Sequence, residues 1–165
     1  MSGRMNAVER RIQSALGTLH DREPRRRWTD GEWTREVKHA VGGTGETLGY
    51  KIYANRCRFK RNGEWLFDLV WLRQGSGGEL LDAPLVLESE WRRAGISDDF
   101  QKLLVARARH RVMVFQARNK TRAVDIIEKL VAQVEVCKLT EPGDRYLFAC
   151  WLNAGRDFFF HLHVT

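Results

Sequence analysis

The sequence predicts an α/β fold with a central mixed β-sheet flanked by helices, and three observations favour it. Apolar residues recur at a helical period in some segments, whereas other segments are short and apolar almost throughout. The two kinds of segment interleave in the order α-α-β-β-β-α-β-α-β-β, which is typical of a sheet with helices on its faces. The length of 165 residues and the 43% hydrophobic content fit one domain with one core.

We therefore expect residues 1–165 to form a single domain. Its N-terminal helices are expected within residues 1–45, and its core sheet with the remaining helices within residues 46–165. The first helix is expected over residues 6–19, where apolar side chains recur every three to four positions.

A second helix is expected from Thr29 or Asp30 to about Val41. Either of the first two residues is a good N-cap, because its side-chain oxygen accepts a hydrogen bond from a free amide of the first turn. The pair Gly42 and Gly43 is expected to end the helix.

Strands are expected where apolar, β-branched and aromatic residues gather between turn residues. An Asn62-Gly63 turn signal predicts a hairpin between the first two of them. The expected strands are residues 50–54, 64–72, 85–90, 111–115, 146–151 and 158–164.

Two more helices are expected between the later strands. The first begins at Ser97-Asp98-Asp99, where Ser97 would cap the helix and the aspartates suit the positive end of its dipole. The second covers residues 121–137 and is clearly amphipathic.

Charge and cysteine content narrow the class of protein. The 28 Lys and Arg residues outnumber the 21 Asp and Glu residues, and the net charge of +7 favours anionic partners such as nucleic acid. The three cysteines, Cys57, Cys137 and Cys150, form no Cys-x-x-Cys pair, so reduced thiols are expected rather than disulfides or a zinc site. The polar N-terminus resembles no signal peptide, and no apolar run is long enough for a membrane span. We therefore expect a cytoplasmic protein with no membrane partner.

Three carboxylates stand at positions that are unfavourable for purely structural residues. Asp68 lies within the expected strand 64–72, where aspartate is disfavoured and a buried charge is costly. Glu88 and Glu90 are two residues apart in a strand, so both project from one face of the sheet. Hard carboxylate oxygens in such a cluster suit Mg²⁺ or Mn²⁺. The alternative is that Asp68 faces solvent and that the two glutamates pair with Arg92 and Arg93.

The sequence around these carboxylates resembles the PD-(D/E)XK, or restriction-endonuclease-like, superfamily. The resemblance covers residues 63–115, about a third of the chain, and includes the order helix, three strands, helix, strand. It implies a restriction-endonuclease-like core in which Asp68 and Glu88 bind a divalent cation. The matching segments are WLFDLVW at 65–71, LVLESEW at 85–91, DFQKLL at 99–104 and VMVF at 112–115.

The chain departs from the superfamily pattern at one position. A lysine usually follows two residues after the second acid and assists hydrolysis, but Glu90 stands there. Some members look similar with the lysine moved to the following helix, which makes Lys102 the natural candidate. On a helical wheel Lys102 lies nearly opposite the apolar stripe and Gln101 lies closer to it, so both remain candidates.

Weaker candidates surround this set. Several superfamily members look to carry a glutamate on the helix before the sheet; Glu36 matches that role, although Glu32 is on the same helix and a solvated helix face is an equal alternative. Nucleic-acid contacts are expected from exposed arginines, with a solvated charged loop as the alternative. These arginines are Arg25, Arg26, Arg27, Arg92 and Arg93.

The leading hypothesis from the sequence is a metal-dependent nuclease that hydrolyses phosphodiester bonds, with DNA the expected substrate and Mg²⁺ or Mn²⁺ the cofactor. The first alternative is a nuclease-like module that has lost catalysis and binds nucleic acid or a protein. The second is a plain interaction domain without an acidic cluster. Small nucleases often act as dimers or in assemblies, so a homodimer or a larger complex is an open alternative to a monomer.

Overall fold

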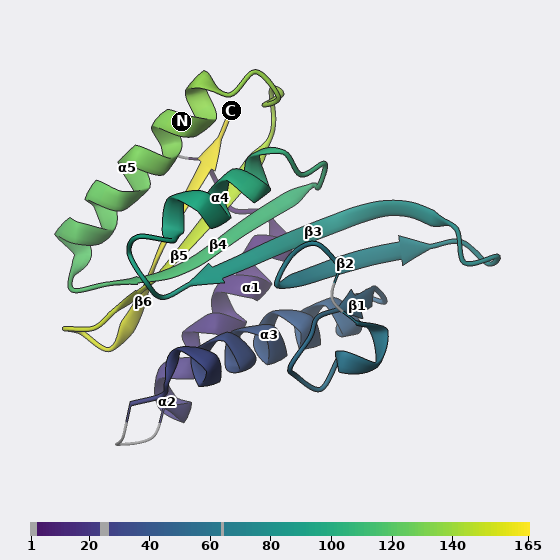
Figure 1. The fold of residues 1–165 in the computed structure, drawn as a ribbon, viewed down its shortest axis with the longest axis horizontal. Coiled ribbons are helices and arrows are strands. Elements are labelled where there is room, and N and C mark those ends of the chain that lie inside the picture. Colours follow the sequence, from purple (N-terminus) through teal and green to yellow (C-terminus); the bar gives the residue numbers. More distant parts are fainter. Residues whose placement is uncertain (1–2, 24–26, 64) are drawn as a thin grey trace.

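The computed structural model describes residues 3–23, 27–63 and 65–165. In these residues a six-stranded sheet lies between two layers of helices (Figure 1). The strands follow one another across the sheet in chain order, β1-β2-β3-β4-β5-β6, and the pairing is parallel in the middle and antiparallel at both sides. The expected α/β class with a mixed central sheet is confirmed.

Parallel pairing joins β3 to β4 and β4 to β5, so the carboxyl ends of these strands meet at one edge of the sheet. Ligands of open α/β sheets commonly bind at such an edge. The strands are β1 (Lys51–Tyr53), β2 (Leu69–Gln74), β3 (Leu80–Glu90), β4 (His110–Ala117), β5 (Arg145–Leu152) and β6 (Asp157–Val164).

The helices cover opposite faces of the sheet. One apolar cluster joins the first face to α1 (Ala7–Gly17), α2 (Leu19–Arg22) and α3 (Asp30–Thr47). A second apolar cluster joins the other face to α4 (Ile96–Leu104) and α5 (Lys120–Val136). Figure 1 shows α4 and α5 on the near side of the sheet and α1 and α3 on the far side.

Side-chain alternation along β3 assigns its residues to the two layers. Leu85 and Leu87 belong to the cluster with α1 and α3, and Val86 belongs to the cluster with α4 and α5. Because successive side chains of a strand point to opposite faces, Glu88 and Glu90 are on the α4 side.

Helix α1 is bound to the sheet by a buried ionic cluster. The Glu9 side chain is fully buried and accepts hydrogen bonds from Arg145 Nε at 2.6 Å and Arg145 Nη2 at 2.8 Å. His110 Nδ1 lies 3.2 Å from Glu9 Oε1. Glu9 also accepts from the Asn6 amide in a capping box, so one carboxylate both starts α1 and ties it to β4 and β5.

The expected end of the second helix at Gly42-Gly43 is wrong, because α3 continues to Thr47. A Cβ atom at Gly42 would lie 2.2 Å from the Phe59 ring, and one at Gly45 would lie 2.6 Å from the Trp71 ring. Glycine is therefore present in α3 because neighbouring aromatic rings approach the helix closely, and not because the helix ends there.

Further boundaries differ from the sequence-based expectation. The expected strand 64–72 begins only at Leu69, because Leu66 has a φ of 65° and the Phe67 amide donates to the Trp65 carbonyl in a tight turn. The segment before it forms a 3-10 helix, Lys60–Asn62, instead of a two-residue hairpin turn. Helix α4 has Gly95 at its N-cap with no side-chain cap, while Ser97 lies inside the helix and accepts from Gln133.

No helix within the described residues is both long and apolar enough to cross a lipid bilayer.

Candidate acidic active site

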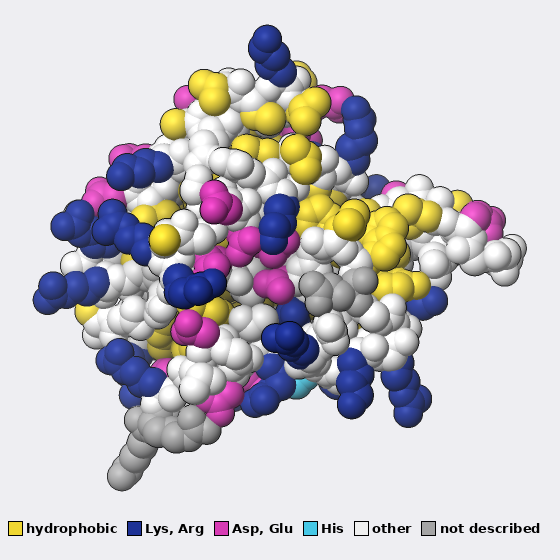
Figure 2. Space-filling model, in the orientation of Figure 1, with side chains coloured by type: hydrophobic (Ala, Val, Ile, Leu, Met, Phe, Trp, Pro, Cys, Tyr) yellow, Lys and Arg dark blue, Asp and Glu magenta, His cyan; other side chains and the backbone are white. Residues whose placement is uncertain are grey.

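Asp68 and Glu88 lie at matching positions of two neighbouring strands. Leu69 pairs with Leu87 in the antiparallel register of β2 and β3, and Asp68 and Glu88 each lie one residue further along. Asp68 is the residue before β2, which corrects the expectation that it lies in the middle of a strand. Figure 2 shows acidic side chains gathered near the middle of the face that carries α4, with Lys and Arg side chains around them.

Glu88 is the most unusual carboxylate of this site. Its side chain is 3% exposed, and its Oε1 atom has no hydrogen-bond partner among the described residues. Burial, reinforced by the nearby charge of Asp68, raises the pKa of Glu88 to about 8. The closest cation is Lys102, whose Nζ lies 3.5 Å from Oε1, a distance long for a hydrogen bond to a carboxylate. A buried carboxylate oxygen is thus left without a donor.

Lys102 reaches the site from the last turn of α4. Its Nζ donates to Asp99 Oδ1 at 2.7 Å, and that hydrogen bond together with the Glu88 charge raises the pKa of the Lys102 ammonium. The long side chain swings toward the sheet although the residue is half exposed. Gln101 is exposed, and its side chain makes no hydrogen bond within the part of the chain that the structure describes. Of the two candidates on this helix, Lys102 is the one beside Glu88.

Asp68 is held by backbone and side-chain donors. Its Oδ2 accepts from the Ser89 amide at 2.9 Å and from Ser89 Oγ at 2.7 Å. Its Oδ1 lies 3.4 Å from Lys38 Nζ, and Lys38 also donates to the Asn55 carbonyl at 3.3 Å. These contacts fix the orientation of the Asp68 carboxylate before any ligand arrives.

Lys38 is a residue that the sequence reasoning missed. It is 4% exposed although lysine is rarely buried. A signal was present, because Lys38 lies next to Val37 and three residues before Val41, on the apolar side of its helix. With Thr34, Asn55 and Asp68 it lines a cavity of about 360 Å³ on the α3 side of the site.

A polar network links α3 to the strand that carries Glu88. Trp91 Nε1 donates to Thr34 Oγ1 at 2.9 Å, and Ser89 Oγ lies 3.4 Å from the same oxygen. Because Ser89 also binds Asp68, the network joins the end of β3, the start of β2 and α3 into one arrangement. The site is therefore built on regular elements and not on a loose loop.

The other candidates occupy separate environments. Glu90 Oε1 accepts from the Arg92 amide at 2.7 Å and lies 3.7 Å from Arg92 Nε, so it is engaged in the turn after β3. Glu36 is buried against Arg22 at 2.7 Å, with Arg35 and His39 as its other partners, and none of these contacts reaches Asp68 or Glu88. The remaining expectations concern arginines: Arg27, Arg92 and Arg93 are exposed, and Arg25 and Arg26 lie outside the described residues.

The donor set matches a magnesium site of the two-carboxylate kind. Among residues 3–23, 27–63 and 65–165, no three His, Cys, Asp or Glu side chains are arranged to hold a metal ion. Mg²⁺, however, is commonly bound by one or two carboxylates, with waters and substrate phosphate completing its shell. Asp68 and Glu88 provide two carboxylates, and Oε1 of Glu88 has no closer contact than Lys102 Nζ at 3.5 Å. The residues present fit Mg²⁺ or Mn²⁺ in that form.

Comparison of the chain with protein-family models, curated proteins and solved structures found no match. The resemblance to the PD-(D/E)XK superfamily is therefore carried by this chain's own residues. Asp68, Glu88 and Lys102, which match its roles, lie together in the structure, whereas Glu90 and Glu36 are engaged elsewhere.

Proposed function

We propose that the protein is a metal-dependent nuclease with a restriction-endonuclease-like core, which hydrolyses phosphodiester bonds, with DNA as the expected substrate. The observation that carries this proposal is the buried Glu88 carboxylate, whose Oε1 lacks a hydrogen bond beside a second carboxylate and a lysine. Burying a carboxyl group beside a second acid is costly, so such a group indicates a site where a cation or a reaction requires it.

Each residue of the site has a distinct part in this proposal. Asp68 and Glu88 would hold Mg²⁺ or Mn²⁺, which when bound lowers the pKa of a coordinated water and offsets the charge of the scissile phosphate. Lys102 donates to an oxygen of the phosphate or orients the attacking water, because its ammonium lies beside Glu88 and faces solvent on its other side. Lys38 and Ser89 are positioning residues that hold the Asp68 carboxylate.

A cleavage assay tests the proposal. Purified protein is incubated with plasmid, single-stranded DNA and RNA, each in Mg²⁺, in Mn²⁺ and in EDTA. We expect cutting of at least one substrate in a divalent cation and none in EDTA. Equal cutting in EDTA would exclude a metal-dependent mechanism, and no cutting under any condition, with retained nucleic-acid binding, would favour the inactive module.

Lys102→Met is expected to lower kcat about a hundredfold with little change in KM, because a donor that acts on charge in the transition state contributes mainly to kcat. The matched control is Gln101→Ala, which should cleave like wild type because the exposed Gln101 side chain forms no hydrogen bond in the described part of the chain. Cleavage rates over a range of substrate concentrations separate the two parameters. A larger loss in Gln101→Ala than in Lys102→Met would reverse the assignment.

A further inference from the structure

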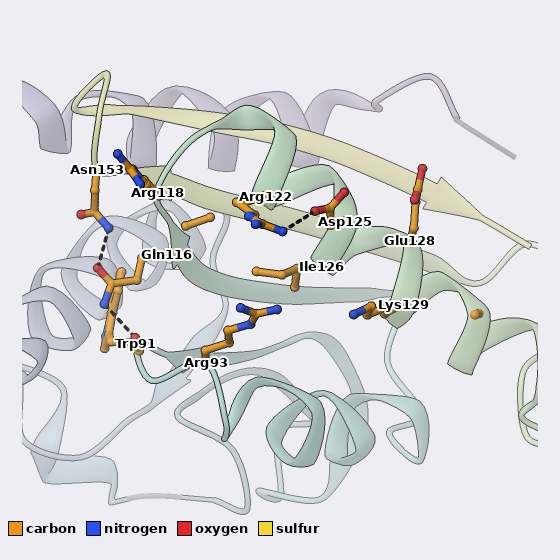
Figure 3. A pocket seen from close by; sticks show the side chains of 12 residues that line it. Trp91, Arg93, Gln116, Arg118, Arg122, Asp125, Ile126, Glu128, Lys129 and Asn153 are labelled. Atoms are coloured by element: carbon orange, nitrogen blue, oxygen red, sulfur yellow. Dashed lines mark hydrogen bonds and ion pairs between the residues drawn. The ribbon is translucent and has the colours of Figure 1, made fainter.

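A second hollow lies at the carboxyl edge of the sheet, where β3, β4 and β5 end and α5 begins. Figure 3 shows this pocket, whose volume of about 660 Å³ is in the usual range of small-ligand pockets. It is separate from the cavity beside Asp68, which α3 lines. The residues around it that matter here are Trp91, Arg93, Gln116, Arg122, Ile126 and Lys129.

The pocket has more cations than carboxylates in its lining, which includes Arg93, Arg118, Arg122 and Lys129 against Asp125 and Glu128. Arg93 follows β3 and Lys129 belongs to α5. Their side chains reach toward each other across the pocket, and the Ile126 side chain lies beside them (Figure 3). Neither forms an ion pair with any residue that the structure describes. Arg122 is paired with Asp125 at 3.3 Å, and the Glu128 side chain points away from the two free cations. Two like charges that converge in this way repel each other, and an anion between them would reverse the sign of the interaction.

The opposite wall of the pocket is fixed by hydrogen bonds. Asn153 Nδ2 donates to Gln116 Oε1 at 3.2 Å, and Gln116 Nε2 donates to the Trp91 carbonyl at 2.7 Å (Figure 3). This chain of amides joins the ends of β3, β4 and β5. A ligand group that enters the pocket therefore meets a preformed polar wall and two exposed cations. Preorganisation of this kind lowers the ordering cost of binding.

The pocket continues the acidic site along the sheet edge. Glu90, two residues after Glu88, pairs with Phe115, and the next residues of the two strands, Trp91 and Gln116, already line the pocket. Glu88 and the pocket residue Trp91 are thus three residues apart along the chain, so an extended anionic polymer bound at one lies close to the other. A free small anion would gain nothing from this continuity.

We propose that this pocket binds a backbone phosphate of a nucleic-acid strand, with Arg93 and Lys129 on either side of the phosphate. The choice of a strand over a free nucleotide rests on the proposed nuclease function, whereas the anion site rests on the pocket itself. Arg118 lines the pocket as well and extends the positive charge around it. Phosphate contacts of this kind position a strand without reading its sequence.

The test measures binding without catalysis. A fluorescein-labelled single-stranded oligonucleotide is titrated with protein in EDTA at several salt concentrations, and anisotropy gives the Kd. The double variant Arg93→Gln/Lys129→Gln is compared with the matched control Arg11→Gln/Lys138→Gln, which removes one exposed arginine and one exposed lysine outside the pocket. We expect the pocket variant to bind about tenfold or more weakly, with the slope of log K against log salt reduced by about 1 to 2. The control should keep the wild-type slope.

The outcomes separate this inference from the nuclease proposal. Weaker binding in the pocket variant alone supports the pocket even if wild-type protein cuts no substrate. Equal binding by both variants overturns the pocket even if wild-type protein cuts in Mg²⁺. A mononucleotide that binds as tightly as the oligonucleotide would also overturn it, because the pocket would then serve a free nucleotide. Thermal unfolding of both variants verifies that each is folded, as expected for exposed side chains.

Discussion

Glu88→Gln is expected to reduce metal-dependent cleavage about a thousandfold while leaving the protein folded. The amide keeps the volume of the buried side chain but removes the charge that would hold the cation. Burial raises the pKa of Glu88 from 4.5 to about 8, so between these pH values the unfolded chain loses this proton while the folded protein keeps it. The free energy of unfolding therefore falls as pH rises from 4.5 toward 8. The glutamine variant should therefore unfold at the same or a higher urea concentration at neutral pH.

The informative comparison for this variant is Glu90→Gln. Glu90 accepts a hydrogen bond from the Arg92 amide in the turn after β3. The amide oxygen of the glutamine variant can still accept this hydrogen bond. We expect a loss of about tenfold or less, since Glu90 is held by the Arg92 amide and would contribute less than a direct ligand. Initial cleavage rates in saturating Mg²⁺ show which of the two variants loses more activity. If Glu88→Gln cuts normally and Glu90→Gln does not, the assignment of the carboxylates is wrong.

Glu9→Gln is expected to lower the free energy of unfolding by about 3 kcal/mol at neutral pH. Burial by itself would raise the pKa of Glu9, but hydrogen bonds from Arg145 and His110 outweigh it and lower the pKa to about 2. The charged form is therefore the one that the fold stabilises. Glutamine cannot neutralise Arg145, which leaves an unpaired charge beside the sheet.

The same cluster predicts a specific pH dependence. A carboxylate whose pKa is lowered on folding contributes its full stability above the unfolded value of 4.5, and the contribution is lost as pH falls toward 2. Urea unfolding of wild type and Glu9→Gln at several pH values should show a difference that shrinks over this window. Glu46→Gln is the control, because its half-exposed ion pair with Arg58 contributes about 1 kcal/mol at most. A difference between wild type and Glu9→Gln that stays constant down to pH 2 would show that Glu9 does not carry the charge.

The order and type of the elements follow from local patterns. The expected helix 121–137 is α5, and the expected strands 146–151 and 158–164 are β5 and β6, within one or two residues at most ends. Their apolar spacing is a property of neighbouring residues, so it can be read without knowing the partner. The capping of α3 by Thr29 can also be predicted from local sequence, because a cap involves residues only three positions apart.

Two of the wrong helix boundaries involve contacts between distant segments. Gly42 looked like a helix end, but it lies within α3 because the Phe59 ring packs on it. Ser97 looked like a cap, but it accepts from Gln133 of α5. In both cases a side chain from elsewhere in the chain outweighs the local preference, and no local pattern contains that partner.

Some residues of the candidate site could be predicted from the sequence, and others could not. Asp68 and Glu88 stand out in the sequence because carboxylates are unfavourable in apolar strands, and the restriction-endonuclease-like resemblance adds Lys102 to them. Lys38 did not stand out, because its closeness to Asp68 depends on how α3 packs against the sheet.

The sequence alone thus determined the α/β fold class, the pair of acidic residues Asp68 and Glu88, and the excess of basic over acidic residues. The burial of Glu88, the unbonded state of its Oε1 and the convergence of Arg93 with Lys129 were not determined by the sequence alone. These properties depend on distances between segments far apart in the sequence, which packing sets once the sheet has formed. Burial then alters the energy of each charge, so the functional meaning of a carboxylate or an arginine emerges only from its surroundings in three dimensions.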